Sequence, residues 1–598
     1  MIGCLALVRA QRIKPIRRNA APSGVRWVSC KGASKDAFIG LIGPLNFRYL
    51  RHRKMMFTRT PDKKRRITAT ALILCVALFL VFFDNLTFFR RVLEVYPLSH
   101  ENLGFLLSIP VLLAALIVFL LTLVGTRHTL KPLLIVLLPV SSLVAYFMDT
   151  YHVVMDKEMI RNVLRTDPGE GLDLLSIRLV LYVLLLGVLP AFWVYRTRIE
   201  RLPGKRGALG KARDLGLSLL VIAGLVLIFS ASYTVFFREH KPLRYYTNPT
   251  YYLYSLGAFL WERTDTVGGI LRPVGEDARV SAADTDRELI ILVVGEAARA
   301  DRFSLNGYGR DTNPLLEKED VIFLPHMHSC GTTTAYSLPC LFSHFPRQGF
   351  TGARGTDTEN LLDVLGHSGH VHVLWRDNNS DSKGVALRVP NEDFKSPKIN
   401  PVCDVECRDV GMLAGLQEVV DAQKKEDILI ILHQMGNHGP AYYKRYPTAF
   451  ARFTPTCDTN RLDECTPEAI GNTYDNAILY TDFFLSRVIA FLKQNSRKFE
   501  TAMVYMSDHG ESLGEHGLYL HGLPYAIAPQ VQKHVAALLW FGDSFHEDID
   551  RQLVLANADK PLSHDNLFHT ILGLLEVETS VYDQTLDITH AKIADTPH

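Results

Sequence analysis

The residues of this chain that could carry out metal chemistry come directly after apolar runs. Glu296 follows Leu289–Val294, and the pair Asp508 and His509 follows Thr501–Met506 after a single serine. Apolar runs of this length predict buried strands of a parallel sheet. Sheets of this kind hold their ligands at the carboxyl ends of the strands. Carboxylates and imidazole are good zinc ligands, so we expect a zinc site at this edge.

A group of hydroxyls between two cysteines supplies a candidate nucleophile. The segment from Cys330 to Cys340 is polar and turn-prone, and it contains Thr332, Thr333 and Thr334. A threonine oxygen would be the fourth zinc ligand. Zinc lowers the pKa of bound water from about 15.7 to near 7. The same effect on a threonine hydroxyl would give an alkoxide-like nucleophile.

Each of these features alone also has a structural explanation. Glu296 could cap the following helix, and Asp508 with His509 could form a turn and a helix cap. The threonines could simply belong to a polar loop. Their combination at strand ends favours a metal-activated hydroxyl nucleophile over these separate explanations.

Two histidines and a lysine in other loops are further candidates. His438 follows the apolar run 427–432, and His521 lies a short distance after His509. Neutral histidines here could bind a second metal, protonate a leaving oxygen or hold a phosphate. A hydrogen-bonded loop histidine is the alternative for each. Lys383 offers a positive charge to a phosphate, or it is a solvated lysine in a turn.

The cysteines predict the compartment. Six of the nine fall in the second half of the chain as closely spaced pairs, which favours short disulfide loops in an oxidising environment. Zinc thiolate sites or reduced thiols are the alternative, but the spacings match no common zinc finger. The pairs are Cys330 and Cys340, Cys403 and Cys407, and Cys457 and Cys465.

The first half of the chain is strongly apolar. Each apolar span approaches or reaches the roughly 17–25 residues that a membrane helix needs. Lys and Arg gather before the first span, between the second and third, and between the fourth and fifth. The positive-inside rule makes these sides cytoplasmic and places everything after the fifth span outside. The spans lie near 67–83, 104–125, 132–148, 179–195 and 215–237.

These patterns divide the chain into four parts. Residues 1–66 form a basic leader, whose first part could be a cytoplasmic arm, a targeting segment or sequence upstream of a true start at Met55 or Met56. Residues 67–237 form a transmembrane domain with five helices. Residues 238–287 form an aromatic-rich bridge that we expect at the membrane surface. Residues 288–598 form the catalytic domain.

In the catalytic domain, apolar strands alternate with helical patterns. This alternation predicts an α/β fold with a doubly wound, largely parallel sheet. Long helical patterns cover about 468–494 and 566–576. The expected strands are 289–294, 370–375, 427–432, 501–506 and 534–541.

Several motifs together resemble a known family. The chain from about Met56 onward is similar to the lipid A phosphoethanolamine transferases, which include the mobile colistin-resistance enzymes. The resemblance implies the alkaline phosphatase/sulfatase fold for the catalytic domain. The motifs are Val293–Glu296, Ser304–Tyr308, Cys330–Ala335, Ser507–Glu511 and His564–Asn566.

The resemblance also implies a role for individual residues. Thr334 matches the nucleophile that carries phosphoethanolamine. The tight zinc site matches Glu296, Thr334, Asp508 and His509. His438 and His521 match family residues that contact substrate or a second zinc. Ser380 and Lys383 match residues that contact the donor lipid. Asn162, Thr166 and Glu170 match residues that hold the ethanolamine head group.

The implied reaction transfers phosphoethanolamine from phosphatidylethanolamine to a lipid A phosphate through a phospho-threonine. The product has less negative charge, which gives polymyxin resistance. We expect a multi-pass protein of the bacterial inner membrane, with its catalytic domain in the periplasm among membrane lipids. We expect a monomer with no nucleic-acid partner. Two alternatives stay open: a sulfatase-like membrane hydrolase or glycerophosphotransferase, and a catalytically dead membrane sensor.

Overall fold

The computed structural model describes most of the chain after the basic leader. The described residues are 66–166, 171–172, 174–200, 204–238, 240–265, 271–280, 286–424, 426–546, 549–590 and 592–593. The predictions for Glu170, for Met55 and Met56, and for nearly all of the leader therefore lie outside them.

The apolar half folds into helices, several of which are bent. Among the described residues, three helices are long and apolar enough to cross a membrane, or up to five if each of two bent pairs is one span. The three are α3 (His100–Val124), α4 (Leu130–Tyr151) and the stretch Ile177–Arg196, which comprises α7 (Ile177–Tyr182), η2 (Val183–Val188) and α8 (Leu189–Arg196). The bent pairs are α1 (Ala69–Phe83) with α2 (Leu86–Val95), and α9 (Gly204–Ile228) with α10 (Ser230–Arg238). The count of five spans therefore stays a prediction.

Shorter helices connect this bundle to the rest of the chain. α5 (Lys157–Arg165) is capped by Asp156, whose side chain accepts from the Met159 amide. η3 (Lys241–Tyr246) and α11 (Thr250–Asp265) lie in the predicted bridge. On α11, Tyr254 is 71% exposed and Trp261 is 72% exposed. Large exposed aromatic side chains of this kind are typical of the membrane–water boundary.

The catalytic half is built on a seven-stranded sheet in the order β3-β11-β8-β2-β7-β5-β6. Five neighbouring strands run parallel. They are β8 (Glu500–Ser507), β2 (Glu288–Gly295), β7 (Asp427–His433), β5 (Val371–Asp377) and β6 (Asn391–Asp393). β11 (Ala537–Phe541) is antiparallel to both β8 and β3 (Ile322–Phe323), so the sheet is mixed rather than parallel throughout.

The reversal of β11 follows from its connection. The chain leaves β8 at the carboxyl edge of the sheet and forms the hairpin of β9 (Ser512–Leu513) and β10 (Tyr519–Leu520). It then enters β11 without a crossover helix. A parallel neighbour would need a crossover connection of about a dozen or more residues that returns to the opposite edge.

The five strands expected from the sequence are all present, and the two long helical patterns correspond to α16 (Pro467–Asn495) and α18 (Asp565–Leu574).

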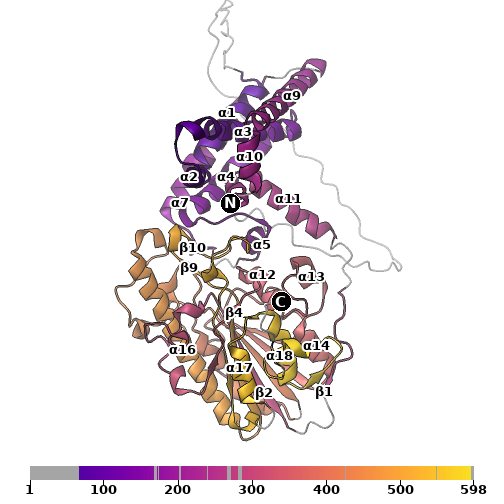
Figure 1. The fold of residues 1–598 in the computed structure, drawn as a ribbon, viewed down its shortest axis with the longest axis vertical. Coiled ribbons are helices and arrows are strands. Elements are labelled where there is room, and N and C mark those ends of the chain that lie inside the picture. The colour runs from indigo at the N-terminus through magenta and orange to yellow at the C-terminus, as the bar shows by residue number, and fades with distance from the viewer. Residues whose placement is uncertain are drawn as a thin grey trace, which may run out of the picture. The chain divides into compact units, whose positions relative to one another are not determined.

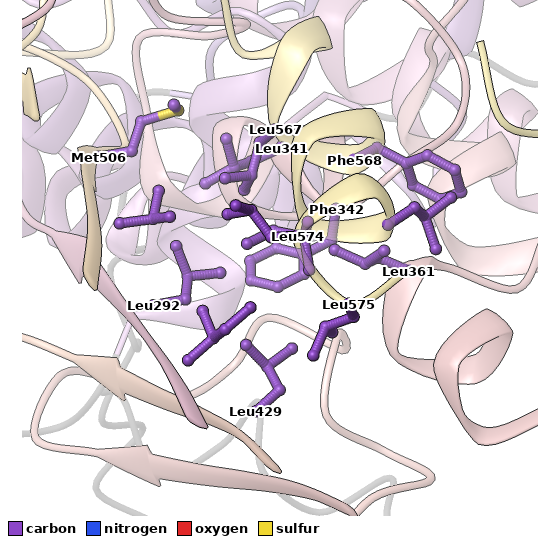
Figure 2. Packing of buried hydrophobic residues seen from close by; sticks show 14 of the residues in the cluster. Leu292, Leu341, Phe342, Leu361, Leu429, Met506, Leu567, Phe568, Leu574 and Leu575 are labelled. Carbon is purple, nitrogen blue, oxygen red and sulfur yellow. The ribbon is translucent and has the colours of Figure 1, made fainter. Parts of the chain in front are cut away.

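The sheet is covered on both faces, which explains why β2 is apolar at every core position. All eight of its residues are buried. Because successive side chains point to opposite faces, Leu292 joins a cluster with α14 (Leu361–Ser368) and α18, whereas Ile291 joins a cluster with α16. Figure 1 shows α16 on one side of the sheet and α14, α17 (Arg551–Ala558) and α18 on the other. Figure 2 shows Leu292 packed among leucines and phenylalanines of the first cluster.

The structure pairs all six cysteines of the catalytic half as the sequence predicts. The disulfides join Cys330 to Cys340, Cys403 to Cys407, and Cys457 to Cys465. Among the described residues, Cys75 is the free cysteine.

Replacement of Leu292 by Ala should destabilise the catalytic half. The side chain is fully buried, so its truncation removes apolar burial and leaves a cavity, at a cost of about 2–5 kcal/mol. Thermal unfolding of the full-length protein in detergent should show a lower Tm. Leu555→Ala is the matched control, because Leu555 is 46% exposed. Equal Tm values for the two variants would contradict this packing.

Candidate active site

Sheet register brings the acidic residues and the histidine together. β2 and β8 are parallel neighbours, and Gly295 pairs with Ser507. Glu296 and Asp508 are the next residues on the two strands and therefore lie side by side. Their segments are joined by hydrogen bonds: Asp508 N–H donates to the Gly295 carbonyl (3.0 Å), and Ala297 N–H donates to Asp508 Oδ1 (3.2 Å). The parallel register thus fixes the spacing of the two carboxylates.

Thr334 faces this pair from the start of another helix. It is the first residue of α12 (Thr334–Leu341), directly after the N-cap Thr333. Its hydroxyl donates to Glu296 Oε2 at 3.1 Å, and its Oγ1 lies 3.3 Å from His509 Nε2. The disulfide between Cys330 and Cys340 closes the loop and helix that carry it. Of the three threonines, Thr334 is the one whose hydroxyl the structure places against Glu296 and His509.

The residues of this cluster fit a metal ion. Glu296, Asp508 and His509 each offer one ligand atom, and these atoms lie within 4.8 Å of one another. All three side chains are fully buried. Glu296 Oε1 and Asp508 Oδ2 accept no hydrogen bond from the residues that the structure describes, although each is close to His509 Nε2, at 3.3 and 3.4 Å. His509 Nδ1 lies 2.9 Å from the Gly510 carbonyl. A proton on Nδ1 donates to this carbonyl and leaves Nε2 as the ligand nitrogen.

The charges of the cluster are strongly coupled. Burial opposes protonation of His509, but the carboxylates of Asp508 and Glu296 outweigh it and raise its pKa to about 10. Burial would raise the pKa of Glu296, but His509 overrides this effect and lowers it. Burial and then the charge of Glu296 raise the pKa of Asp508 to about 6. In the absence of a metal ion, the positive charge of protonated His509 therefore compensates the negative charge of the two carboxylates.

His438 and His521 also lie near this cluster. The ring centroids of His509 and His521 are 4.2 Å apart, and those of His438 and His521 are 6.0 Å apart. His521 Nδ1 lies 3.0 Å from Glu511 Oε2, and Glu511 is fully buried. Sequence reasoning quoted Glu511 in a motif but gave it no role. Its position two residues after His509 was the available signal.

Asn379 is a second residue to which the sequence analysis gave no role. Its Nδ2 donates to Glu296 Oε2 (2.9 Å) and to the Gln434 carbonyl (2.7 Å). Asn379 is fully buried and lies just after β5. Its amide therefore holds the same carboxylate oxygen that accepts from Thr334. Its position a few residues after the predicted strand 370–375 was the available signal in the sequence.

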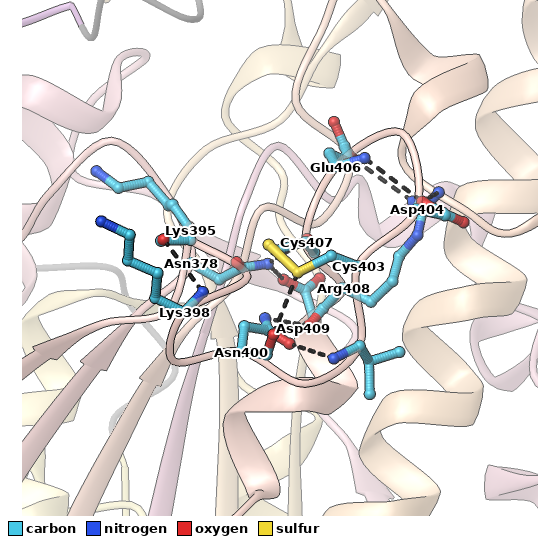
Figure 3. Close-up of a disulfide and its surroundings, with 12 residues drawn as sticks. Asn378, Lys395, Lys398, Asn400, Cys403, Asp404, Glu406, Cys407, Arg408 and Asp409 are labelled. Carbon is cyan, nitrogen blue, oxygen red and sulfur yellow. Dashed lines mark hydrogen bonds and ion pairs between the residues drawn. A yellow bond between two sulfur atoms is a disulfide. The ribbon is translucent and has the colours of Figure 1, made fainter.

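A second disulfide supports the segment that contains Asn379. The neighbouring Asn378 donates through Nδ2 to the Cys407 carbonyl (3.0 Å) and to Asp409 Oδ1 (2.7 Å). Figure 3 shows Asn378 and Asp409 beside the Cys403–Cys407 bridge. Asp409 also accepts from the backbone N–H groups of residues 435 and 436, in the loop that leads to His438. The disulfide loop, the β5 loop and the β7 loop are thus tied together.

The predicted donor-lipid residues lie where α5 meets the catalytic half. Lys383 Nζ donates to Ser380 Oγ and to the Arg165 carbonyl, the latter at 3.2 Å. Arg165 in turn donates to the carbonyls of Lys383 (3.2 Å) and Ala335 (3.4 Å), and Ala335 follows Thr334. The structure therefore brings α5 beside both Lys383 and α12.

Two of the three residues predicted to contact the ethanolamine head group are described by the structure, and both lie on or at the end of α5. Asn162 is on α5, and Thr166 is its C-cap residue, whose hydroxyl donates to the Asn162 carbonyl at 2.8 Å. Both are half-buried. Their positions relative to a lipid head group stay a prediction.

Comparison with known proteins identifies the class and then the family. A family model described as Sulfatase matches residues 288–577, the part that carries the sheet and the strand-end cluster. The catalytic half is thus a domain of the alkaline phosphatase/sulfatase superfamily. A model described as Phosphoethanolamine transferase EptA/EptB matches residues 113–264.

The relatives extend over most of the chain. Phosphatidylethanolamine transferase Mcr-1 of Escherichia coli is 41% identical over 536 residues, which cover 87% of this chain and 98% of the relative. Phosphoethanolamine transferase EptA of Escherichia coli K12 is 38% identical over 536 residues, 88% of this chain and 97% of the relative. The structure of the integral membrane protein lipooligosaccharide phosphoethanolamine transferase A from Neisseria meningitidis matches with a TM-score of 0.85 and 35% identity, over 88% of this chain and 99% of that one. The chain belongs to the phosphoethanolamine transferase family.

Zinc binding should compete with protons at His509. Because the pKa of this side chain is raised to about 10 in the metal-free protein, Nε2 must lose a proton before it can bind the ion. The apparent zinc affinity of the full-length protein, measured against a chromophoric chelator, should rise about tenfold per pH unit between about pH 6.5 and 8. His509→Ala should abolish tight binding, whereas His326→Ala, at an exposed histidine, should not. A pH-independent affinity would contradict the proton competition.

Proposed function

We propose that this protein transfers phosphoethanolamine from phosphatidylethanolamine to a phosphate of lipid A through a phospho-threonine at Thr334. The observation that carries the proposal is the position of the Thr334 hydroxyl, 3.1 Å from Glu296 Oε2 and 3.3 Å from His509 Nε2. The names of the relatives support the transferred group and the donor. A relative named for lipooligosaccharide supports a phosphorylated glycolipid as the acceptor.

The chain's own residues account for the first half of the reaction. The Thr334 hydroxyl donates to Glu296 Oε2, so its proton can move to this carboxylate as Oγ1 attacks the lipid phosphorus. The bond from phosphorus to the diacylglycerol oxygen then breaks. His438 or His521 protonates this leaving oxygen, since the ring of His521 lies beside His509 and the ring of His438 lies beside His521. Lys383, at the α5 contact, provides a positive charge for the phosphate.

The second half reverses the roles. A phosphate oxygen of lipid A attacks the phosphorus of phospho-Thr334, the bond from phosphorus to Oγ1 breaks, and the hydroxyl recovers its proton. Zinc held by Glu296, Thr334, Asp508 and His509 would act as a Lewis acid that stabilises the threonine alkoxide. His438, His521 and Glu511 could hold a second ion instead of serving as proton donors. The product carries an added amine, so cationic peptides such as polymyxins bind the modified surface less well.

The proposal includes a location. Residues 67–237 form the membrane domain, 238–287 the bridge and 288–598 a catalytic domain in the periplasm at the inner membrane. The three disulfides suit an oxidising compartment. The exposed aromatics of α11 suit a bridge on the membrane surface. This location gives the active site access to phosphatidylethanolamine in the outer leaflet.

Mass spectrometry of lipid A from expressing cells tests the function. We expect an added phosphoethanolamine. An added glycerophosphate would support a glycerophosphotransferase instead, and unmodified lipid A would support a hydrolase or an inactive sensor.

Thr334→Ala should abolish both the covalent phospho-enzyme and the lipid A modification, because the attacking oxygen is removed. Thr356→Ala is the matched control, since Thr356 is an exposed residue of α13 (Gly352–Asp357) whose hydroxyl donates only within that helix. Intact-protein mass spectrometry after incubation with phosphatidylethanolamine should detect the adduct in the control and not in Thr334→Ala. Transfer by Thr334→Ala at the wild-type rate would refute the nucleophile.

A further inference from the structure

A pocket separate from the active site lies between the candidate membrane span Ile177–Arg196 and the Cys457–Cys465 loop of the catalytic half. Its volume is about 500 Å³, within the range of about 300–1,000 Å³ that is usual for ligand sites. One wall is α7 and the start of η2, and the other wall includes an arginine of the Cys457–Cys465 loop. The lining residues are Ile177, Arg178, Leu181, Tyr182, Leu185 and Arg461.

The apolar wall continues a face that is suited to lipid. Ile177, Leu181 and Leu185 are spaced by four residues, so a helix places them along one face. They are 81%, 49% and 56% exposed. They belong to the candidate span Ile177–Arg196, and only 22% of the most apolar 18-residue stretch of this span is buried within the protein. An acyl chain of the surrounding bilayer could therefore lie along this face and enter the pocket.

The helix also changes its winding at this point. η2 is a π-helical stretch between two α-helical ones. π-helical turns are rare and occur frequently at functional sites. Leu185, which lines the pocket, is a residue of this stretch. The irregular backbone therefore coincides with the pocket wall.

The polar end of the pocket carries charges of both signs. Arg178 pairs with Asp463, and Arg461 pairs with Glu464 at 2.6 Å. Arg461 Nε is buried and has no hydrogen-bond partner among the described residues. Its free donor requires an acceptor, and a phosphate oxygen is the acceptor that guanidinium groups bind well. The two carboxylates beside the arginines are suited to an ammonium group.

The loop that carries these charges is held in place. Arg461, Asp463 and Glu464 all lie between Cys457 and Cys465, which are joined by a disulfide. Leu462, in the middle of the loop, is 1% exposed and anchors it in the apolar core. The charged groups are thus presented by a closed and anchored loop, which favours a built site over a chance arrangement of surface side chains.

We propose that this pocket is an entry site for phosphatidylethanolamine, a zwitterionic phospholipid, on its way to Thr334. Its phosphate would lie between Arg461 and Arg178, its ammonium group against Asp463 or Glu464, and one acyl chain along Leu181 and Leu185. An anionic phospholipid would have no positive group to meet the two carboxylates. This assignment rests on the proposed function, which makes phosphatidylethanolamine the donor.

Continuous packing connects the pocket to the threonine loop. Leu179, between the lining residues, belongs to the same buried cluster as Tyr146, Tyr151 and Met159. A Cβ on Gly522 would come 2.2 Å from Met159 Cε and 3.2 Å from Thr333 Cγ2, so the glycine allows Met159 to lie against the threonine loop. The pocket and the active site are therefore two positions along one contiguous part of the structure.

Arg461→Gln in the full-length enzyme tests the entry site. The variant should raise KM for phosphatidylethanolamine about tenfold, as expected for loss of one charge-assisted contact of about 1.4 kcal/mol. Because Arg461 would act before the chemical step, kcat should stay unchanged. Arg452→Gln is the matched control: this arginine is on the catalytic half, pairs with Asp311 at 2.9 Å and does not line the pocket. An Arg461→Gln variant with an unchanged KM would overturn the proposal.

Lipid retention provides a readout that needs no turnover. Native mass spectrometry of the full-length protein, released from micelles that contain phosphatidylethanolamine and phosphatidylglycerol, should show preferential retention of phosphatidylethanolamine. The double variant Asp463→Asn/Glu464→Gln should lose this preference, because the groups that meet the ammonium are neutral. Wild-type protein that prefers phosphatidylglycerol would refute the zwitterion assignment. Normal retention without any lipid A modification would instead refute the proposed function and leave the lipid site intact.

Discussion

The active site depends on balancing two carboxylates that are buried side by side. Removal of a charged group from water costs several kcal/mol unless an opposite charge or hydrogen bonds compensate. Glu296 and Asp508 are fully buried, and His509 Nε2 lies 3.3 Å from Glu296 Oε1 and 3.4 Å from Asp508 Oδ2. A metal ion would supply the remaining positive charge. This electrostatic demand explains why a histidine, an asparagine amide and backbone N–H groups surround the pair.

The sheet makes this costly arrangement possible at a fixed geometry. Glu296 and Asp508 are far apart in sequence, but strand register places them on adjacent ends of β2 and β8. The loops around them are then tied to one another by disulfides and by buried hydrogen bonds through Asn378, Asn379 and Asp409. A rigid scaffold of this kind lets Thr334 keep its hydroxyl directed at Glu296, an orientation that the proposed nucleophile would need.

The proposed lipid donor would impose a second demand, because its phosphate is attached to chains that prefer the bilayer. The fold meets it by letting elements of the membrane half contact the catalytic half. α5 brings Arg165 to the carbonyls of Ala335 and Lys383. α7 brings an apolar face to the charged Cys457–Cys465 loop. Both contacts contain guanidinium groups, and the α7 contact adds an apolar face, features that suit the proposed phospholipid donor.

Local patterns in the sequence predicted five of the seven strands of the main sheet, the two long helices, the disulfide pairs and the strand-end residues Glu296, Asp508 and His509. The choice of Thr334 came from the family resemblance. The periodicity of apolar residues, the spacing of cysteines and the position of a residue after a predicted strand are properties of short segments. They can therefore be recognised in the sequence without knowledge of the fold. The tertiary structure alone decided the antiparallel β11, the bends in the membrane helices, the support of Glu296 by Asn379, and the meeting of α7 with Arg461. Each of these depends on which distant segments become neighbours, and that choice is made by the packing of the whole chain.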